Sequence, residues 1–349
     1  MKSTKITILL VLSAVFVLNL SQCEPPEITS AKVYLQQNNP KAAEEQLLQA
    51  LEKYPDNAQA AFLLATNIYR PQKQYEKARD MLVKARALDP NLAKDVDLMI
   101  RGIWAEIHTS GATQFNDALR AFLPSDKDSL LKVAAKQFEY ALQFNDTAKI
   151  TYNGLIKSYY LLNDTAHVVK FAQEMFAKNI ADPEVMKYYY EFRWTQGKEA
   201  ETLAELEKAI KQFPTAYNLQ ILYITYLAQV EQYQEAINVC KKILEKDPQN
   251  LDVVYILAQI YTKVNNFEEA KYLYQKVLAE NPNDLELLTR AAENIFNSKD
   301  WVTAEDYARH IIELDPESAF GYEVLWKSLY NQGKREEAEK YREIAKSLR

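Results

Sequence analysis

A fixed spacing of thirty-four residues runs through most of this chain and limits what it can fold into. Six positions, each of which follows a stretch with helical apolar periodicity, lie thirty-four residues apart: Asp146, Ile180, Pro214, Pro248, Pro282 and Pro316. A constant period of this length is typical of stacked supersecondary units, in which each unit contacts only its neighbours. We therefore expect a scaffold that presents a long surface rather than a single closed core.

The composition favours helices throughout the chain. The 349 residues include only 6 glycines, and strong helix formers such as Ala, Leu, Glu and Lys are plentiful. No stretch has the alternating Val, Ile and Thr pattern of a sheet. The formal net charge is −6 and no basic run occurs, so nucleic acid is a poor candidate for a partner.

The first twenty-three residues have the layout of an export signal. Lys2 and Lys5 form a basic start, and an apolar run follows over residues 6–20. This run is short for a membrane-spanning helix, which needs about 20 apolar residues. We therefore expect residues 1–23 to direct export of a mature chain that comprises residues 24–349.

The end of this segment, Leu20-Ser21-Gln22-Cys23, resembles a bacterial lipobox. The resemblance implies that Cys23 receives a diacylglycerol and becomes the new N-terminus, although Gln22 departs from the small residue preferred there. Two or more acyl chains anchor a protein stably. The alternative is ordinary cleavage after Cys23. With Cys23 acylated, Cys240 is the one remaining thiol, and no internal disulfide can form.

Residues 251–284 form the clearest repeat unit. Two amphipathic helical patterns flank Asn265-Asn266, and a loop this short makes the two helices antiparallel. Pro282 cannot continue the second helix. Asp284 is a good N-cap for the helix that follows. The apolar faces consist of Val254, Leu257, Ala258 and Tyr261 in the first helix, and of Phe267, Ala270, Tyr274, Val277 and Leu278 in the second.

This unit resembles a tetratricopeptide repeat. Its small residue at position eight is Ala258, the alanine at position twenty is Ala270, the aromatic residue at twenty-four is Tyr274, and the proline at thirty-two is Pro282. Two helices approach closely at the small residues. A larger side chain there would overpack the contact and destabilise the fold by about 1–3 kcal/mol. The alanine at position twenty recurs as Ala43, Ala78, Ala134, Ala236, Ala270, Ala304 and Ala338, with Val168 and Thr202 in its place in the middle of the chain.

The resemblance implies an all-α fold, a right-handed superhelical solenoid of about nine helix-turn-helix units over residues 24–349. The units start near residues 24, 58, 93, 149, 183, 217, 251, 285 and 319. The third unit is one period plus 22 residues long, and the extra residues fall near 108–129. Gly111, Pro124 and Ser125 punctuate this insertion. Insertions in solenoids map to loops on one face, so the segment either contributes to binding or packs over neighbouring units.

No catalytic or metal-binding pattern is present in the sequence. His108, His167 and His310 are far apart, and no metal-ligand spacing or phosphate loop occurs. We expect a protein without a cofactor and without enzymatic activity. Cys240 occupies the aromatic core position of its unit, so we expect it to be buried and inert.

In tetratricopeptide proteins the first helix of each unit lines a concave groove. By this resemblance, aromatic residues at the groove positions form a partner-binding surface for a protein or peptide. The alternative for each ring is that it fills the space between adjacent first helices. The candidate groove residues are Tyr69, Trp104, Tyr160, Trp194, Tyr255, Phe296 and Tyr330.

Three functions remain open from the sequence. The first is a non-enzymatic scaffold that binds proteins of envelope assembly, secretion or polymer export while a lipid on Cys23 holds it to a bacterial membrane. The second is a carbohydrate or small-ligand receptor that uses the same aromatic groove, since sugars stack on Trp and Tyr. The third is an accessory subunit that regulates a partner enzyme.

Overall fold

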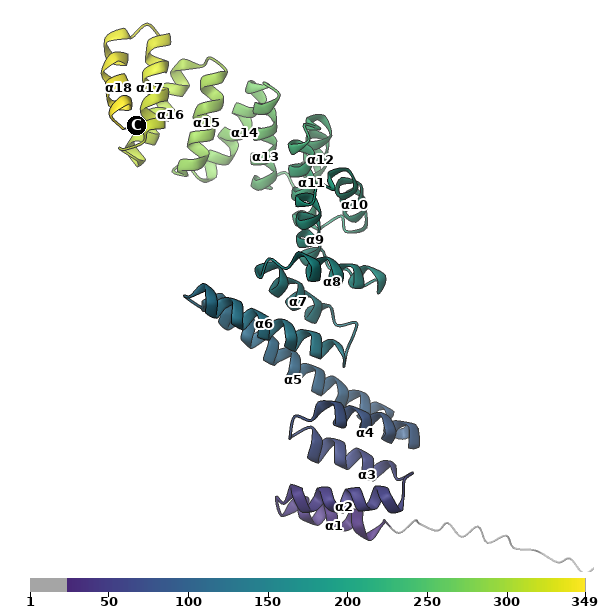
Figure 1. The fold of residues 1–349 in the computed structure, drawn as a ribbon. Helices are drawn as coiled ribbons and strands as arrows, with labels where there is room; N and C mark the ends of the chain where they lie inside the picture. The colour runs from purple at the N-terminus through teal and green to yellow at the C-terminus, as the bar shows by residue number, and fades with distance from the viewer. Residues whose placement is uncertain (1–23, 349) are drawn as a thin grey trace, which may run out of the picture. The chain divides into compact units, whose positions relative to one another are not determined.

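The computed structural model describes residues 24–348 and is helical throughout that range, with eighteen α-helices and no strand (Figure 1). The predicted lipidation site, Cys23, and the whole of residues 1–23 lie outside the described residues. The chain divides into two compact units, with the division between Leu155 and Ile156. The prediction of an all-α solenoid is confirmed.

The first unit contains three complete helix pairs and the start of a fourth. A π-helical turn, η1, continues α3, and a short 3-10 turn, η2, precedes α5. The bounds are α1 (Pro26–Gln36), α2 (Pro40–Lys53), α3 (Ala58–Leu63), η1 (Leu64–Tyr69), α4 (Tyr75–Leu88), η2 (Pro90–Leu92), α5 (Ala93–Arg120), α6 (Pro124–Leu142) and α7 (Lys149–Leu161), whose last residues belong to the second unit.

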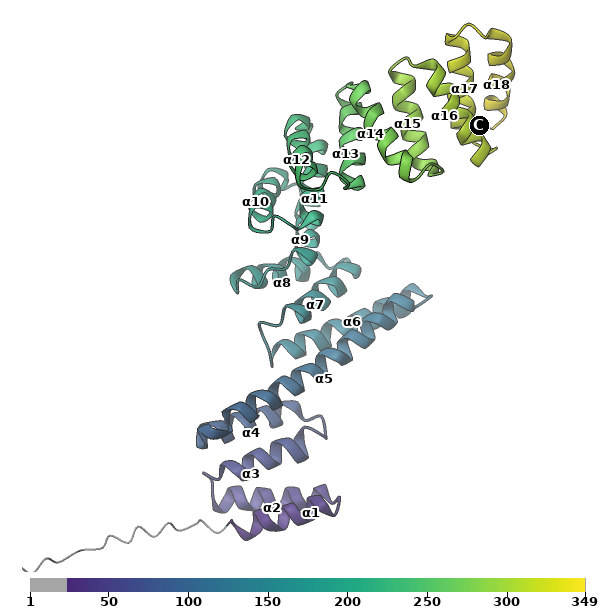
Figure 2. The ribbon, with the colours of Figure 1, turned by 180° about the vertical axis from the view of Figure 1, so that it is seen from behind.

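The second unit contains regular helices of 13 or 14 residues. In both views α13 to α18 lie side by side in chain order (Figures 1 and 2). The bounds are α8 (Thr165–Ala177), α9 (Pro183–Thr195), α10 (Glu199–Gln212), α11 (Tyr217–Gln229), α12 (Tyr233–Lys246), α13 (Leu251–Lys263), α14 (Phe267–Glu280), α15 (Leu285–Asn297), α16 (Trp301–Leu314), α17 (Ala319–Asn331) and α18 (Arg335–Ser347).

The eighteen helices of residues 24–348 form nine pairs, as the period predicts. The first helices of the second to ninth pairs begin at the expected unit starts, and α1 begins two residues after its expected start. The helix α14 ends two residues before Pro282, because proline cannot donate the next backbone hydrogen bond. Asp284 caps α15, since its carboxylate accepts a 3.0 Å hydrogen bond from the Leu287 amide.

A left-handed residue closes the turn inside most pairs and follows the same period. From the fourth pair onward, the residue with positive φ lies at Asn163, Gly197, Glu231, Asn265, Lys299 and Gly333, thirty-four residues apart. Asn and Gly enter this conformation readily, whereas other side chains bring Cβ too close to the following carbonyl. The turns at Glu231 and Lys299 are therefore strained.

Small side chains separate the two helices of each pair, as the repeat pattern predicts. The seven position-twenty alanines expose 2% of their surface or less, and Val168 and Thr202, which replace them in the fourth and fifth pairs, are fully buried. The hydroxyl of Thr202 donates a 2.7 Å hydrogen bond to the Lys198 carbonyl, which satisfies it inside the core. Cys240 is also fully buried, and burial raises the pKa of its thiol to about 12.

The second pair is one residue longer than the period, and a π-helical turn absorbs the extra residue. The unit starts at residues 58 and 93 are thirty-five apart, and the Arg70 amide donates to the Ala65 carbonyl, five residues back. A π-turn inserts one residue into a helix without ending it. The side chains that follow the insertion therefore shift by one position relative to the repeat.

The extra residues of the third pair form helix rather than a loop, which corrects the expectation from sequence. They lengthen α5 to 28 residues and α6 to 19, and the connecting turn lies at residues 121–123. Gly111 lies inside α5 and does not punctuate it. A Cβ there would lie 3.0 Å from the ring of Phe138, so the glycine permits close packing of α5 on α6. None of the helices within residues 24–348 combines the length and apolar character that crossing a bilayer requires.

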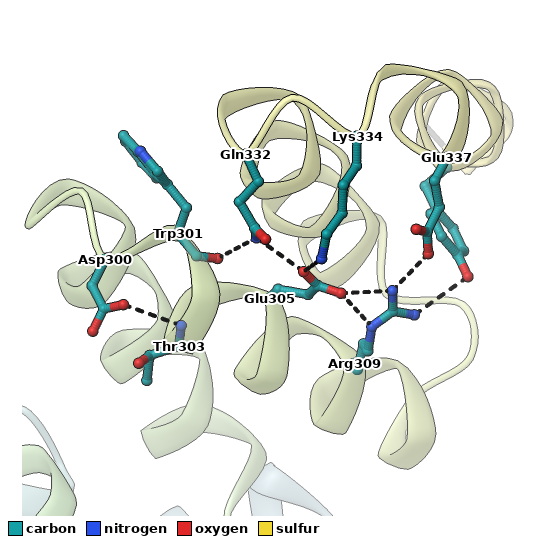
Figure 3. Close-up of polar contacts among 9 residues, drawn as sticks. Asp300, Trp301, Thr303, Glu305, Arg309, Gln332, Lys334 and Glu337 are labelled. Carbon is teal, nitrogen blue, oxygen red and sulfur yellow. Dashed lines mark hydrogen bonds and ion pairs between the residues drawn. The ribbon is translucent and has the colours of Figure 1, made fainter.

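A charged network fastens the last pair to the one before it (Figure 3). Glu305 on α16 accepts hydrogen bonds from Arg309 at 2.8 Å, from Lys334 at 2.9 Å and from Gln332 at 2.9 Å. Arg309 also reaches Glu337 on α18 at 2.7 Å. Burial alone would raise the pKa of Glu305, but the hydrogen bonds from Lys334, Arg309 and Gln332 outweigh it and lower the pKa to about 2.

Replacing the strained left-handed residue Glu231 by glycine should stabilise the protein. We expect Glu231→Gly to raise the free energy of unfolding by about 0.5–1 kcal/mol, because glycine adopts positive φ without a Cβ clash. The matched control is Glu245→Gly, at an exposed position in the last turn of α12, which should lower stability by about 0.5 kcal/mol because glycine is a poor helix former. Thermal and urea denaturation measure both. A loss of stability in both variants would show that the turn at Glu231 is not strained.

The network around Glu305 should make docking of the last pair dependent on pH. The pKa of Glu305 is lower in the folded state than in the unfolded chain, so its stabilising contribution is present above about pH 4.3 and is lost as the pH falls towards 2. We expect Glu305→Gln to destabilise α17 and α18 at pH 7 by about 1–3 kcal/mol, since a neutral amide pairs poorly with two cations. Hydrogen exchange of α17 and α18 amides measures this.

The matched control for this prediction is Glu343→Gln on α18, because Glu343 is exposed and pairs with Lys346 alone among the described residues. This variant should change exchange rates little. The difference between wild type and Glu305→Gln should shrink below pH 4. An equal effect of both substitutions at pH 7 would contradict the role of the network.

Candidate functional site

Tyr69, the first of the predicted groove residues, lies in the core of the first unit, so its assignment to the groove is wrong. Its side chain is 8% exposed and belongs to the hydrophobic cluster that joins α1 to α5. The cause is the π-turn η1, which inserts one residue before the end of the helix. Tyr69 therefore occupies the position equivalent to eleven, where Tyr261, Ile295 and Leu329 are also buried.

Trp104 is half-buried and held by packing and a hydrogen bond within the first unit. Its Nε1 donates to Thr151 Oγ1 at 3.0 Å, and its ring stacks on His108 with 5.5 Å between ring centroids. The Thr151 hydroxyl is also 3.2 Å from His108 Nδ1. Burial lowers the pKa of His108, which favours the neutral imidazole in this contact. Trp104 thus joins α5 to α7 and offers only part of its surface to a partner.

Tyr160 and Trp194 lie among neighbouring aromatic rings of the second unit, which we call the central aromatic cluster: Tyr160, Tyr188, Phe192, Trp194 and Tyr226. The ring centroid of Tyr160 on α7 lies 4.1 Å from that of Tyr188 and 5.4 Å from that of Phe192, both on α9. Trp194 on α9 stacks on Tyr226 of α11 at 3.9 Å. Each ring fills the space between neighbouring first helices. Four of them, Tyr160, Tyr188, Phe192 and Trp194, remain partly accessible, and Tyr226 is buried.

Glu191 places a negative charge within the central aromatic cluster. Burial and the neighbouring carboxylate of Glu191 raise the pKa of Tyr160. The same two causes, with burial the larger, raise the pKa of Tyr226. One carboxylate oxygen of Glu191, Oε2, is buried and makes no hydrogen bond to the described residues. The cluster therefore combines apolar rings with one fixed negative charge.

Basic side chains border the cluster. Lys157 on α7 pairs with Glu184 at the start of α9, and the ammonium of Lys187 lies 4.8 Å from the ring centroid of Tyr188. Such cation–π contacts contribute about 0.5–1 kcal/mol at exposed sites. The polar rim around apolar rings is the arrangement found at the centre of protein interfaces.

Phe296 and Tyr330 come together at a second place, the C-terminal pocket, a cavity of about 410 Å³ between α15, α17 and α18. Trp326 and Arg342 line it as well, and the Arg342 guanidinium lies 5.8 Å from the Trp326 ring centroid. In the repeat pattern position eight is small and position twenty-four aromatic. Here the large ring is at position eight, as Trp326, and Arg342 takes position twenty-four. Tyr330 is 55% exposed, the most accessible of the predicted groove residues.

Tyr255 stands apart from both groups. It lines a small cavity of about 210 Å³ together with Asp252, Asp284 and Glu286 at the ends of α13 to α15. Its ring packs edge to face on Tyr274, with 6.1 Å between centroids. The surroundings of Tyr255 are therefore acidic, unlike those of the central aromatic cluster.

Four residues of these two groups were missed from the sequence: Tyr188, Phe192, Tyr226 and Trp326. A signal for two of them was present. Position twelve of one first helix meets position ten of the next, as Tyr160 meets Phe192 and Trp194 meets Tyr226. Pairing aromatic residues between units at this offset would have found both contacts.

Within the described residues, no group of three His, Cys, Asp or Glu side chains is arranged to hold a metal ion. The aromatic rings, the carboxylate of Glu191 and the bordering lysines supply apolar contact, hydrogen bonds and charge.

Comparison with known proteins gives two family matches. Residues 28–93 and residues 227–289 each match a model described as tetratricopeptide repeat. No curated protein matches the chain in sequence. Among solved structures, MamA from Desulfovibrio magneticus RS-1 is 16% identical with a TM-score of 0.44, and the match covers 48% of this chain and 94% of that chain.

A second solved structure, YrrB, is described as a TPR protein with an unusual peptide-binding site. It is 19% identical with a TM-score of 0.41, and the match covers 62% of this chain and 93% of that chain. With TM-scores below 0.5, neither likeness carries weight for fold or function.

The nine antiparallel helix pairs of residues 24–348 define a helical-repeat protein. The two family matches, together with the recurring position-twenty alanines, show that the chain contains tetratricopeptide repeats at residues 28–93 and 227–289. Proteins of this family typically mediate protein–protein interaction rather than catalysis.

Proposed function

We propose that this chain is a non-catalytic scaffold that binds partner proteins or peptides through its first helices. A lipid on Cys23 anchors it to a bacterial membrane, where it serves envelope assembly, secretion or polymer export. The observation that carries the binding surface is the run of partly accessible aromatic rings on consecutive first helices, from Tyr160 on α7 to Trp194 on α9.

The fixed geometry of these rings supports protein binding. Each ring of the central aromatic cluster packs on a ring of the next helix, so it loses little conformational freedom when a partner arrives. Large, rigid aromatic side chains with a polar rim are the residues that contribute most binding energy at interfaces. Tyr330 adds an exposed ring at the other end of the second unit.

The same packing gives less support to a carbohydrate receptor. A sugar stacks on the open face of an aromatic ring, whereas Trp194 has one face covered by Tyr226 at 3.9 Å and Tyr160 lies 4.1 Å from Tyr188. A regulatory subunit of an enzyme would use the same protein-binding surface, so it is a special case of the scaffold.

The lipid anchor has a separate basis. It rests on the sequence of residues 1–23 and the resemblance of residues 20–23 to a lipobox. An acylated N-terminus would hold the repeats at a membrane surface without a spanning segment.

Site-specific photocrosslinking in intact cells tests the binding surface. We expect a photoreactive phenylalanine in place of Tyr188 or Tyr330 to form adducts with a partner protein. The matched control is the same substitution at Tyr272. This residue is 65% exposed, compared with 55% for Tyr330, but it lies on a second helix, α14. Adducts that form equally from Tyr272, or from that position alone, would contradict binding through the first helices.

Metabolic labelling with a fatty acid tests the anchor. We expect the wild-type chain to incorporate label and to fractionate with membranes, and Cys23→Ala to do neither, because the acylated thiol is absent. Cys240→Ala is the control, since its buried thiol should not be acylated. Equal labelling of wild type and Cys23→Ala would overturn the anchor and leave the binding surface to be judged by crosslinking.

A further inference from the structure

A cavity of about 330 Å³ lies between the second helices α10 and α12 and the first helix α11. Its wall is apolar, and the ring of Tyr223, which is 7% exposed, forms part of it. The ring of Tyr217, half-exposed, lies at its edge. A volume of this size takes one large apolar side chain and part of a backbone. The other apolar residues of the wall are Ile210, Pro214, Val239 and Ile243.

Lysines dominate the charged edge of this cavity. Lys211 pairs with Glu207 at 2.6 Å, so these two charges offset each other. Lys242 and Lys246 make no ion pair with any described residue, and Glu235 is the one acidic side chain left to face them. The edge is therefore locally positive on a chain whose formal net charge is −6.

One buried polar atom at the cavity wall has no partner. The Nε2 of Gln220 donates to the Pro214 carbonyl at 2.8 Å, which leaves the Oε1 as the acceptor of the amide. The Gln220 Oε1 is buried and accepts no hydrogen bond from the described residues, and the residue is 9% exposed. A buried acceptor without a donor is energetically unfavourable, so a ligand that brings an N–H group relieves this penalty on binding.

We propose that this cavity binds an acidic peptide segment of a partner protein, which inserts one apolar side chain between α10 and α12. The apolar wall receives the side chain, Gln220 Oε1 accepts a backbone N–H of the peptide after a small rotation of its amide, and Lys242 and Lys246 attract its carboxylates. This site deepens the proposed scaffold function but shares no residue with the central aromatic cluster, so it can be tested separately from that cluster.

The complementary charge selects an acidic partner over a basic one. Charges at the edge of an interface mainly set the rate of association and its dependence on salt, whereas the buried apolar contact sets the rate of dissociation. A ligand of this cavity must therefore have two separate features: negative charges around the inserted residue, and an apolar side chain as the inserted residue itself.

Fluorescence anisotropy with synthetic peptides and the full-length protein tests both of these ligand features. The probe is a short labelled peptide with aspartates around one central leucine, compared with the same peptide carrying serine at the centre and with one carrying lysines around leucine. We expect the acidic leucine peptide to bind at least about tenfold more tightly than either, and its binding to weaken as salt increases.

A pair of neighbouring lysines provides a matched control in the protein. Lys242→Glu should weaken binding of the acidic leucine peptide by about tenfold, because the substitution reverses a charge at the cavity. Lys241→Glu changes the net charge equally, but Lys241 does not line the cavity, so it should have little effect. Gln220→Met, which keeps the shape of the side chain and removes the acceptor, should also weaken binding.

Three results would overturn this inference. They are equal binding of the leucine and serine peptides, equal effects of Lys242→Glu and Lys241→Glu, and loss of binding in Trp194→Ala. Loss of binding in Trp194→Ala would show that the peptide binds at the central aromatic cluster. That outcome would support the proposed function but contradict a second binding site at the cavity. Binding that is unchanged in Trp194→Ala and lost in Lys242→Glu would support this inference.

Discussion

The close approach of two antiparallel helices at one small side chain is the contact on which every pair depends. Ala270 and its six equivalents are at most 2% exposed, and each lies where the second helix of a pair meets the first. Interiors pack to near crystal density, so a longer side chain at this position would push the helices apart and disturb the contact with the next pair. The aromatic surfaces are positioned by this spacing, because each ring reaches its partner on the next first helix only at that distance.

The regular part of the fold could be predicted from sequence because it depends on local signals that repeat. Pro282 ends α14, Asp284 caps the helix that follows, and the buried alanine of each pair sets the distance between its two helices. Each signal acts within a few residues, so reading one unit suffices to place the others. The nine unit starts follow from this, to within two residues.

The sequence-based predictions fail where an insertion changes the register or the shape of a repeat unit. The π-turn η1 contains one extra residue, which places the side chain of Tyr69 in the core instead of the groove. Position numbers counted from the start of the unit do not show where in the helix that residue is inserted. The sequence predicts that Gly111 punctuates the insertion in the third pair, yet the glycine lies inside α5 and accommodates the ring of Phe138 in a long hairpin. The accessible rings of the candidate groove could be predicted in part from sequence. Tyr160, Trp194 and Tyr330 keep accessible surface, but the partner rings Tyr188 and Tyr226 come from neighbouring units and required a rule of contact between repeats.

The recurrence of the left-handed turn at an equal interval has a consequence for how such a chain can change length. The turns at Gly197, Glu231, Asn265 and Lys299 occupy equivalent places, so duplication or deletion between two of them joins a turn to its own equivalent and leaves caps and interhelix contacts in order. Recombination can therefore lengthen or shorten this region in whole steps of one repeat. The third pair is excluded from such exchange, because its long helices match no other pair in residues 24–348.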